Sequence, residues 1–336
     1  MTQRMKRVVV TTGLREADIR PPALMSEFKR LSIQDALDFF ADPECRVEIA
    51  CPACGGGNAH AVFNKQDFVY RECAECRSVY VSPRPNAETL ARYYANSRAS
   101  RFRVEHFSRD TAKARRYHLL RSHAEWMSQI ADELDLPTPR SYADVETHSP
   151  EIFEEVAALS TFTVFFSVNP LLPVPHKEGC NVQSTEWPQC RVTAISAFEK
   201  IEHQFAPETL LKKMADALVP GGVLFFTTRT ISGFDLQVLW DKTPYLFVPE
   251  HINLLSIEGI TRLLERLGLR LIELSTPGQL DVELVRHACR HDPSIQLPKF
   301  IDYLLNHRDA LAHEDFQEFL QKHRLSSHVR VAARKV

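Results

Sequence analysis

From Ser141 onward, runs of apolar residues alternate with stretches in which apolar positions recur at helical spacing. The runs that indicate strands are SYADV (141–145), TFTVFFSV (161–168), VTAISAFE (192–199) and GGVLFFTT (221–228). Continuous apolar strands separated by helices predict a parallel sheet that helices cover on both faces. The expected fold class is therefore α/β, with a doubly wound and mostly parallel sheet.

Two further strands are expected near the end of the chain, at RLIELST (270–276) and HVRVAARK (328–335). Between them lie two helical patterns, LPKFIDYLLNHR (297–308) and HEDFQEFLQKHR (313–324). We expect them to form a helical insertion at about 277–326.

Overall composition excludes several classes of protein. Hydrophobic residues make up 44% of the chain and charged residues 25%, as in an ordinary globular protein. The net charge of -2 provides no basic field for nucleic acid or an anionic membrane. No apolar run approaches the roughly 18 residues of a membrane span, and the first residues lack the apolar segment of a secretory signal. We therefore expect a cytoplasmic protein.

Four of the eight cysteines form two CxxC pairs, CPAC and CAEC, separated by 18 residues. Two residues between thiolates suit a tight knuckle that directs both sulfur atoms to one tetrahedral zinc ion. The predicted ligands are Cys51, Cys54, Cys73 and Cys76. A closed four-cysteine site is structural and has no open position for chemistry.

The chain thus divides into four predicted parts. An N-terminal extension (1–45) precedes a small zinc ribbon (46–85), and a basic, helix-prone linker region (86–140) follows it. The linker region ends in LPTPR (136–140), and the α/β domain occupies 141–336.

Three stretches carry a resemblance to a known family. They are CPAC...CAEC...VYVSPRP, SAFEKIEHQFAPETLLKKMADALVPGGVLFFTT and PEHINLLSIEGITRLLERLGLRLIELSTPG. The chain resembles class I S-adenosylmethionine-dependent methyltransferases, in particular the branch with an N-terminal zinc ribbon that includes sugar C-methyltransferases. The resemblance implies a seven-stranded Rossmann-like sheet, S-adenosylmethionine as cofactor and a small-molecule substrate such as a sugar or nucleotide-sugar.

The expected cofactor loop departs from the family's pattern, in which an acidic residue is followed by three alternating glycines. Here Asp144 supplies the acid, but Glu146, His148 and Pro150 stand at the glycine positions. Side chains there would project toward the cofactor, and left-handed backbone would be disfavoured. Ser149 and Pro150 instead predict a helix start, with Ser149 as N-cap.

The carboxylate that the resemblance implies for the cofactor's ribose is also replaced. Asn169 follows the second strand, and its amide offers one acceptor oxygen where a carboxylate offers two. Asp144 and Glu199, with Glu146 and Asn169, are the residues that could still hold polar parts of the cofactor. Two interpretations stay open: a methyltransferase with an altered cofactor pose, and an inactive pseudo-methyltransferase that serves as a binding or assembly subunit beside a protein partner.

Candidate catalytic residues follow from the same resemblance. Glu250 and His251 stand where sugar C-methyltransferases carry a Glu-His pair, although the tyrosine expected before them is Val248. A histidine held by a carboxylate suits proton removal next to a carbonyl. The alternative is a loop histidine that only shapes the pocket.

Two further groups of residues are candidates for the site. Glu202 and His203 form a second Glu-His pair, which a solvated helix start would also explain. Arg115 and Arg116 lie in a basic helical stretch and are candidates for holding a diphosphate, although a solvated helical face is the alternative.

Overall fold

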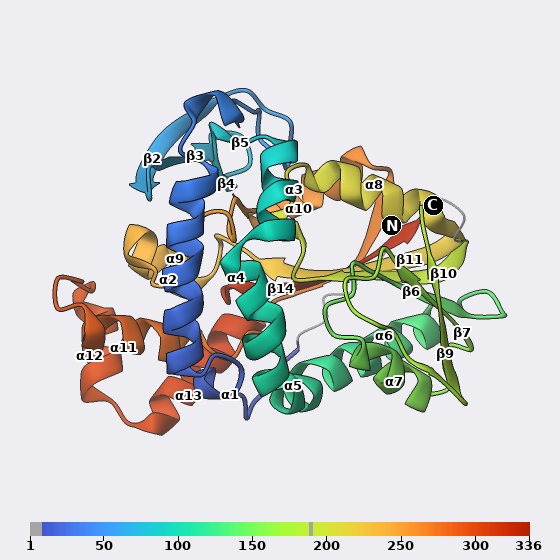
Figure 1. Ribbon diagram of the computed structural model, residues 1–336. Helices are drawn as coiled ribbons and strands as arrows, with labels where there is room; N and C mark the ends of the chain where they lie inside the picture. The colour runs from blue at the N-terminus through green and yellow to red at the C-terminus, as the bar shows by residue number, and fades with distance from the viewer. Residues whose placement is uncertain (1–8, 188–190) are drawn as a thin grey trace.

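The computed structural model describes residues 9–187 and 191–336, so the first eight residues of the predicted extension lie outside the described part. Its central sheet has the strand order β13-β14-β11-β10-β6-β7-β9-β8 (Figure 1). These strands are β6 (Ser141–Val145), β7 (Val164–Val168), β8 (His176–Lys177), β9 (Cys180–Thr185), β10 (Val192–Phe198), β11 (Leu218–Arg229), β13 (Leu269–Ser275) and β14 (His328–Lys335). Neighbours from β11 through β10, β6 and β7 to β9 are parallel, as the apolar runs predicted.

The expectation of seven strands is wrong by one. The eighth strand is β8, which has two residues and pairs antiparallel with β9 at the edge of the sheet. The turn Gly179, at φ +75°, lets the chain reverse between them. The polar edge strands carry no continuous apolar run, so the pattern that revealed the central strands does not reveal β8 and β9.

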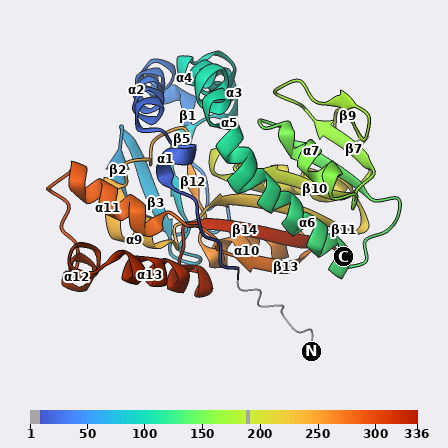
Figure 2. The same ribbon diagram turned by 90° about the horizontal axis from the view of Figure 1, so that it is seen from below.

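Helices cover both faces of the sheet (Figure 2). One face packs against α8 (Pro207–Ala217) and α10 (Ile257–Arg266), and the other packs against α6 (Arg121–Glu133) and α7 (Glu151–Ala158). Alternation along the strands explains this, because Tyr142 belongs to one core and Ala143 to the other. The helix α7 begins at Glu151 with Pro150 as N-cap and no side-chain cap bond, so the prediction of Ser149 as N-cap is wrong.

The cysteine-containing segment forms a second sheet, in the order β12-β4-β3-β2. Its strands are β2 (Ala59–Lys65), β3 (Phe68–Cys73), β4 (Val79–Val81) and β12 (Asn253–Leu254). The last of these comes from the α/β half of the chain and pairs with β4. Arg84 is fully buried and donates to the carbonyls of Phe205 and Ile252 at 3.0 and 3.1 Å. The cysteine segment is thus built into the larger domain.

A nearly continuous helix leads from the cysteine segment to the central sheet. It comprises α4 (Arg98–Phe102), α5 (Arg109–Arg115) and α6, joined by the π-helical segments η2 (Arg103–Ser108) and η3 (Arg116–Leu120). A wider π turn changes which face each side chain occupies. Arg103 in η2 and Arg115 just before η3 consequently face the interior of the protein.

The insertion contains three helices, α11 (Asp281–His291), α12 (Lys299–His307) and α13 (Ala310–Lys322), where two were predicted. They gather at the opposite end of the molecule from α7 and β9 (Figure 1). The N-terminal helices α1 (Glu16–Ile19) and α2 (Pro22–Phe39) lie beside them. Among the described residues, no helix is both long and apolar enough to span a membrane.

Candidate functional site

The carboxyl ends of β6, β10 and β11 open onto a cavity of about 330 Å³. In an open α/β sheet this edge is where ligands bind. The cavity floor includes Asp144, Phe198 and Arg229 from the three strands. Its walls come from the N-terminal segment, the long helix, the loop before β12 and the start of the insertion. A volume of this size suits a small metabolite.

Three of the parallel strands end in the same backbone conformation. Glu146, Asn169 and Glu199 follow β6, β7 and β10 and have φ values of +50°, +49° and +53°. Each backbone N–H donates to the carbonyl of the next strand along, at 2.8 to 3.1 Å. These hydrogen bonds offset the conformational free-energy cost of left-handed backbone, which is on the order of 1 kcal/mol or more per non-glycine residue. The loop thus adopts left-handed backbone at Glu146, although a residue other than glycine disfavours that conformation.

The cavity contains four of the six predicted cofactor and catalytic residues. Asp144, Glu199, Glu250 and His251 line it. Asn169 is exposed to solvent at the end of β7, and neither it nor Glu146 is among the lining residues. The predicted ribose position is thus separate from the cavity.

A lysine that follows β10 contacts the predicted cofactor loop. The Lys200 ammonium hydrogen bonds to Nδ1 of His148, and Lys200 is only 5% exposed. Burial lowers the pKa of Lys200 to about 8, while Glu146 and Asp144 act in the opposite direction. Burial and the adjacent ammonium lower the pKa of His148 to about 2. At neutral pH this contact therefore joins a cation to a neutral imidazole.

Two carboxyl groups on the cavity floor, those of Asp144 and Glu199, have pKa values shifted in opposite directions. Burial raises the pKa of Asp144 to about 6, although Ser196 donates a hydrogen bond to it. Burial also opposes ionisation of Glu199, but His328 and Thr227 outweigh it and lower the pKa of Glu199 to about 2. The His328 Nδ1 lies 3.4 Å and the Thr227 hydroxyl 2.7 Å from its Oε1 atom. Glu199 is thus a fixed negative charge at neutral pH.

Glu250 pairs with residues that the sequence did not associate with it. Its Oε2 atom accepts from the Arg103 guanidinium and lies 3.8 Å from Nδ1 of His203. The Nδ1 of His251 is buried and has no hydrogen-bond partner in the described part of the chain. The predicted carboxylate-histidine contact is therefore between Glu250 and His203, from a different segment, rather than between neighbours.

Both histidines are neutral at physiological pH. Burial, then Arg229, holds the pKa of His251 well below its usual range, and burial lowers the pKa of His203 to about 4. Burial and the neighbouring Glu199 raise the pKa of Glu202 to about 8, so its carboxyl group is mainly protonated. Glu202 also lines the cavity and accepts from the Thr228 hydroxyl at 2.7 Å.

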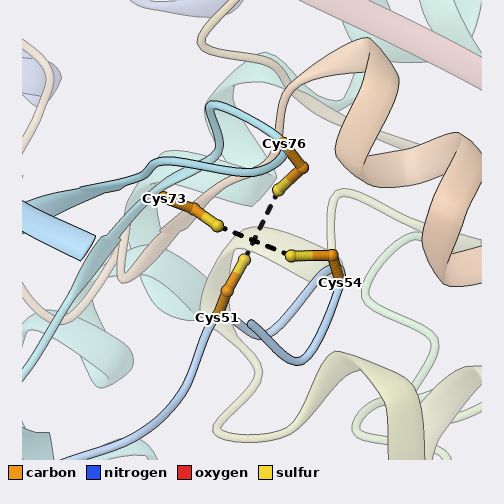
Figure 3. A group of neighbouring side chains, drawn as sticks. All are labelled: Cys51, Cys54, Cys73 and Cys76. Carbon is orange, nitrogen blue, oxygen red and sulfur yellow. Dashed lines mark hydrogen bonds between the residues drawn. The ribbon is translucent and has the colours of Figure 1, made fainter. Parts of the chain in front are cut away.

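The four CxxC cysteines point toward one another (Figure 3). Their sulfur atoms all lie within 4.8 Å of each other, and two of the separations are 3.5 Å. A tetrahedron with arms of about 2.3 Å, the zinc–sulfur distance, has edges of roughly 3.8 Å. Cys51, Cys54, Cys73 and Cys76 can therefore hold a metal ion, and their geometry fits zinc.

The cluster is tied to α10. The Ser256 hydroxyl donates to the carbonyl of Cys76 and accepts from the N–H of Gly259 at 2.8 Å, which caps the helix. The Ser256 side chain thus contacts the metal-binding segment and also caps α10, which packs in the core.

Comparison with known proteins identifies the family. The family model described as "Methyltransferase domain" matches residues 54–274, well over half of the chain. A search of curated protein sequences gives no match.

Solved structures show remote likeness. A candidate sarcosine dimethylglycine methyltransferase from Galdieria sulphuraria is 14% identical, with a TM-score of 0.41 over 66% of this chain and 87% of that one. A geranyl diphosphate C-methyltransferase from Streptomyces coelicolor A3(2) is 16% identical, with a TM-score of 0.40 over 69% and 85%. The family match is decisive: the chain belongs to the methyltransferase-domain family.

Proposed function

We propose that this protein is a non-catalytic member of its family, whose cavity binds a small ligand while the ordinary S-adenosylmethionine position is blocked. The observation that carries the proposal is the buried contact between Lys200 and His148 at the cofactor loop. S-adenosylmethionine, when bound, supplies a methyl group from a positively charged sulfonium. A buried ammonium beside that position repels it, because like charges interact strongly where water is excluded.

The rest of the loop supports the same conclusion. Glu146 and His148 bring side chains to positions where the resemblance implies glycine, and the backbone keeps the left-handed turn at Glu146. The exposed Asn169 offers no carboxylate to a ribose. The residues present do not fit S-adenosylmethionine in its usual pose, so we derive no methyl-transfer step.

Calorimetric titration with S-adenosylmethionine and S-adenosylhomocysteine tests the proposal. We expect no saturable heat at micromolar ligand for the zinc-loaded protein. Micromolar binding of S-adenosylmethionine would contradict a blocked site.

A second candidate function is methyl transfer to a sugar or nucleotide-sugar in a different cofactor pose. The cluster of His203, Glu250 and His251 favours it, because neutral imidazoles beside a carboxylate can accept a proton in the cavity. Methylation of nucleotide-sugars, followed by mass spectrometry and lost in His203→Ala, would support this candidate. A cytoplasmic location, zinc as the metal and a protein partner remain predictions under either proposal.

A further inference from the structure

The N-terminal segment forms part of the cavity wall and is anchored to the helical insertion. The Thr11 N–H donates to the Gln321 side chain at 3.0 Å, and its hydroxyl donates to the Pro277 carbonyl at 2.8 Å. Leu14 N–H donates to the Gln279 side chain at 2.9 Å. These contacts hold Arg20, at the end of α1, against the cavity.

Three arginines around the cavity have a carboxylate partner. Arg103 pairs with Glu250, and the Arg229 Nη2 atom lies 2.7 Å from Asp235. Arg330 pairs with Glu273 in the same way, at 3.0 Å. These guanidinium charges are compensated within the protein.

Arg20 and Arg115 differ from them. Neither guanidinium has an ion pair or a side-chain hydrogen bond to any residue within 9–187 or 191–336, and both line the cavity. Arg20 lies over the Tyr245 ring, 5.4 Å from its centroid. Burial lowers the pKa of both groups and Glu199 acts in the opposite direction on each. An arginine guanidinium stays protonated in proteins. They are two half-buried guanidinium groups that have no direct carboxylate partner in the described chain.

Glu199 is the carboxylate that faces both arginines. It attracts each of them, but its Oε1 atom already accepts from Thr227 and lies beside His328. Glu16 also attracts Arg20, and Glu151 also attracts Arg115, but neither carboxylate forms an ion pair with these guanidinium groups in the described chain. A further donor that lines the cavity is unused, because Nη1 of Arg229 is buried without a hydrogen-bond partner in the described chain.

We infer that Arg20 and Arg115 form an anion-binding site that holds the phosphate or carboxylate group of a small molecule in this cavity. Guanidinium forks match the oxygen geometry of both groups, and unpaired buried donors are satisfied when such a group binds. The site joins the N-terminal segment to the long helix, so the ligand contacts two elements that lie outside the central sheet. The inference rests on the proposed role of the cavity in binding a small ligand.

Isothermal titration with inorganic phosphate, pyrophosphate and malonate, at low and at physiological ionic strength, tests the site. We expect saturable binding of at least one probe and a weaker affinity at higher salt. Arg20→Gln and Arg115→Gln should each lower the affinity by about tenfold or more. The control is Arg116→Gln, which removes the same charge one position away, where Arg116 pairs with Glu155 at 2.6 Å outside the cavity lining, and should leave the affinity unchanged.

The outcomes separate the two sources of the anion. Preference for phosphate or pyrophosphate indicates a phosphorylated ligand, and preference for malonate indicates a carboxylate. Arg115→Lys, which keeps the charge but not the fork, should retain part of the binding and shows that loss in Arg115→Gln is not misfolding. No saturable binding of any probe, or wild-type affinity in both glutamine variants, would overturn the inference. Because the probes lack an adenosyl group, this result is independent of the titration with S-adenosylmethionine.

Discussion

His148 and Lys200, 52 residues apart in the chain, hydrogen bond to each other where β6 and β10 end. The strand, the left-handed turn and the helix after β6 are all present, so the framework of a cofactor loop persists. The His148 imidazole lies in the turn where the resemblance implies glycine, and the Lys200 ammonium reaches it from the end of β10.

Replacing Lys200 should distinguish electrostatic repulsion from steric blocking of S-adenosylmethionine. In Lys200→Met, we expect the affinity for S-adenosylmethionine to rise by about tenfold or more, because removal of the ammonium relieves like-charge repulsion. Affinity for S-adenosylhomocysteine, whose thioether sulfur carries no charge, should rise less. Calorimetry at millimolar ligand measures both, and Lys212→Met on the exposed face of α8 is the control. Equal gains for the two ligands would mean that size, rather than charge, blocks the site.

Asp144 should make stability depend on pH in a defined window. Its carboxyl group is 6% exposed, and burial raises its pKa from 3.8 to about 6. Between these values the folded state binds more protons than the unfolded state, so the contribution of Asp144 is present below about pH 4 and is lost as pH rises through 6. Relative to Asp144→Asn, wild-type protein should lose on the order of 2 kcal/mol across this window.

Urea unfolding of both proteins at several pH values between 4 and 7 provides the measurement. Asp132→Asn, on an exposed carboxylate at the end of α6, is the matched control and should track the wild type more closely. A constant difference between wild type and Asp144→Asn would show that Asp144 is ionised throughout the range.

Removal of the metal should destabilise the whole domain rather than a separate module. Cys76 is buried and its carbonyl accepts from Ser256, the N-cap of α10, and β12 of the α/β half pairs with β4. Chelation, or Cys76→Ser, should lower the free energy of unfolding by several kcal/mol. Differential scanning calorimetry and zinc analysis, with one zinc expected per chain, measure the effect.

The control for the metal site is Cys289→Ser, which changes a half-buried free thiol in α11 and should keep the zinc. A separate low-temperature transition for the cysteine segment, with the main transition unmoved, would contradict the coupling.

The sequence predicted the strands and helices whose own residues show a clear hydrophobic pattern. The strands β6 (Ser141–Val145) and β14 (His328–Lys335) coincide with the apolar runs that indicated them. The strand β9 has only a short alternation of apolar and polar residues, and it pairs with β7 on one side and with the two-residue β8 on the other. Local patterns identify buried strands well because both of their faces must be apolar.

The sequence predicted the functional residues only where a single segment of the chain contains all of them. The CxxC spacing brought together four sulfur atoms that do lie in one cluster. The partners of Glu250 are Arg103 and His203, and no sequence spacing relates these three residues. The sequence did not identify Arg20 as a site residue. A single arginine in the N-terminal extension has no local pattern that predicts its position at the cavity, which only the fold establishes.

The anchor of the N-terminal segment can be tested through Gln321, which is 3% exposed in α13. Its amide donates to the carbonyls of Thr11 and Gly278 at 3.0 and 2.8 Å, and its oxygen accepts from the Thr11 N–H. Gln321→Leu fits the same space but removes these bonds, at a cost of about 1–3 kcal/mol. We expect faster proteolysis and amide exchange in residues 9–20, with less change in the central sheet, because two of the three lost bonds hold this segment and the Gly278 carbonyl still accepts from Gln317. Lys322→Leu, which removes a surface contact with Glu318, is the control. Unchanged exchange in residues 9–20 of Gln321→Leu would mean that the apolar contacts of Ile19 and Leu14 with Leu284, rather than these hydrogen bonds, hold the cavity wall in place.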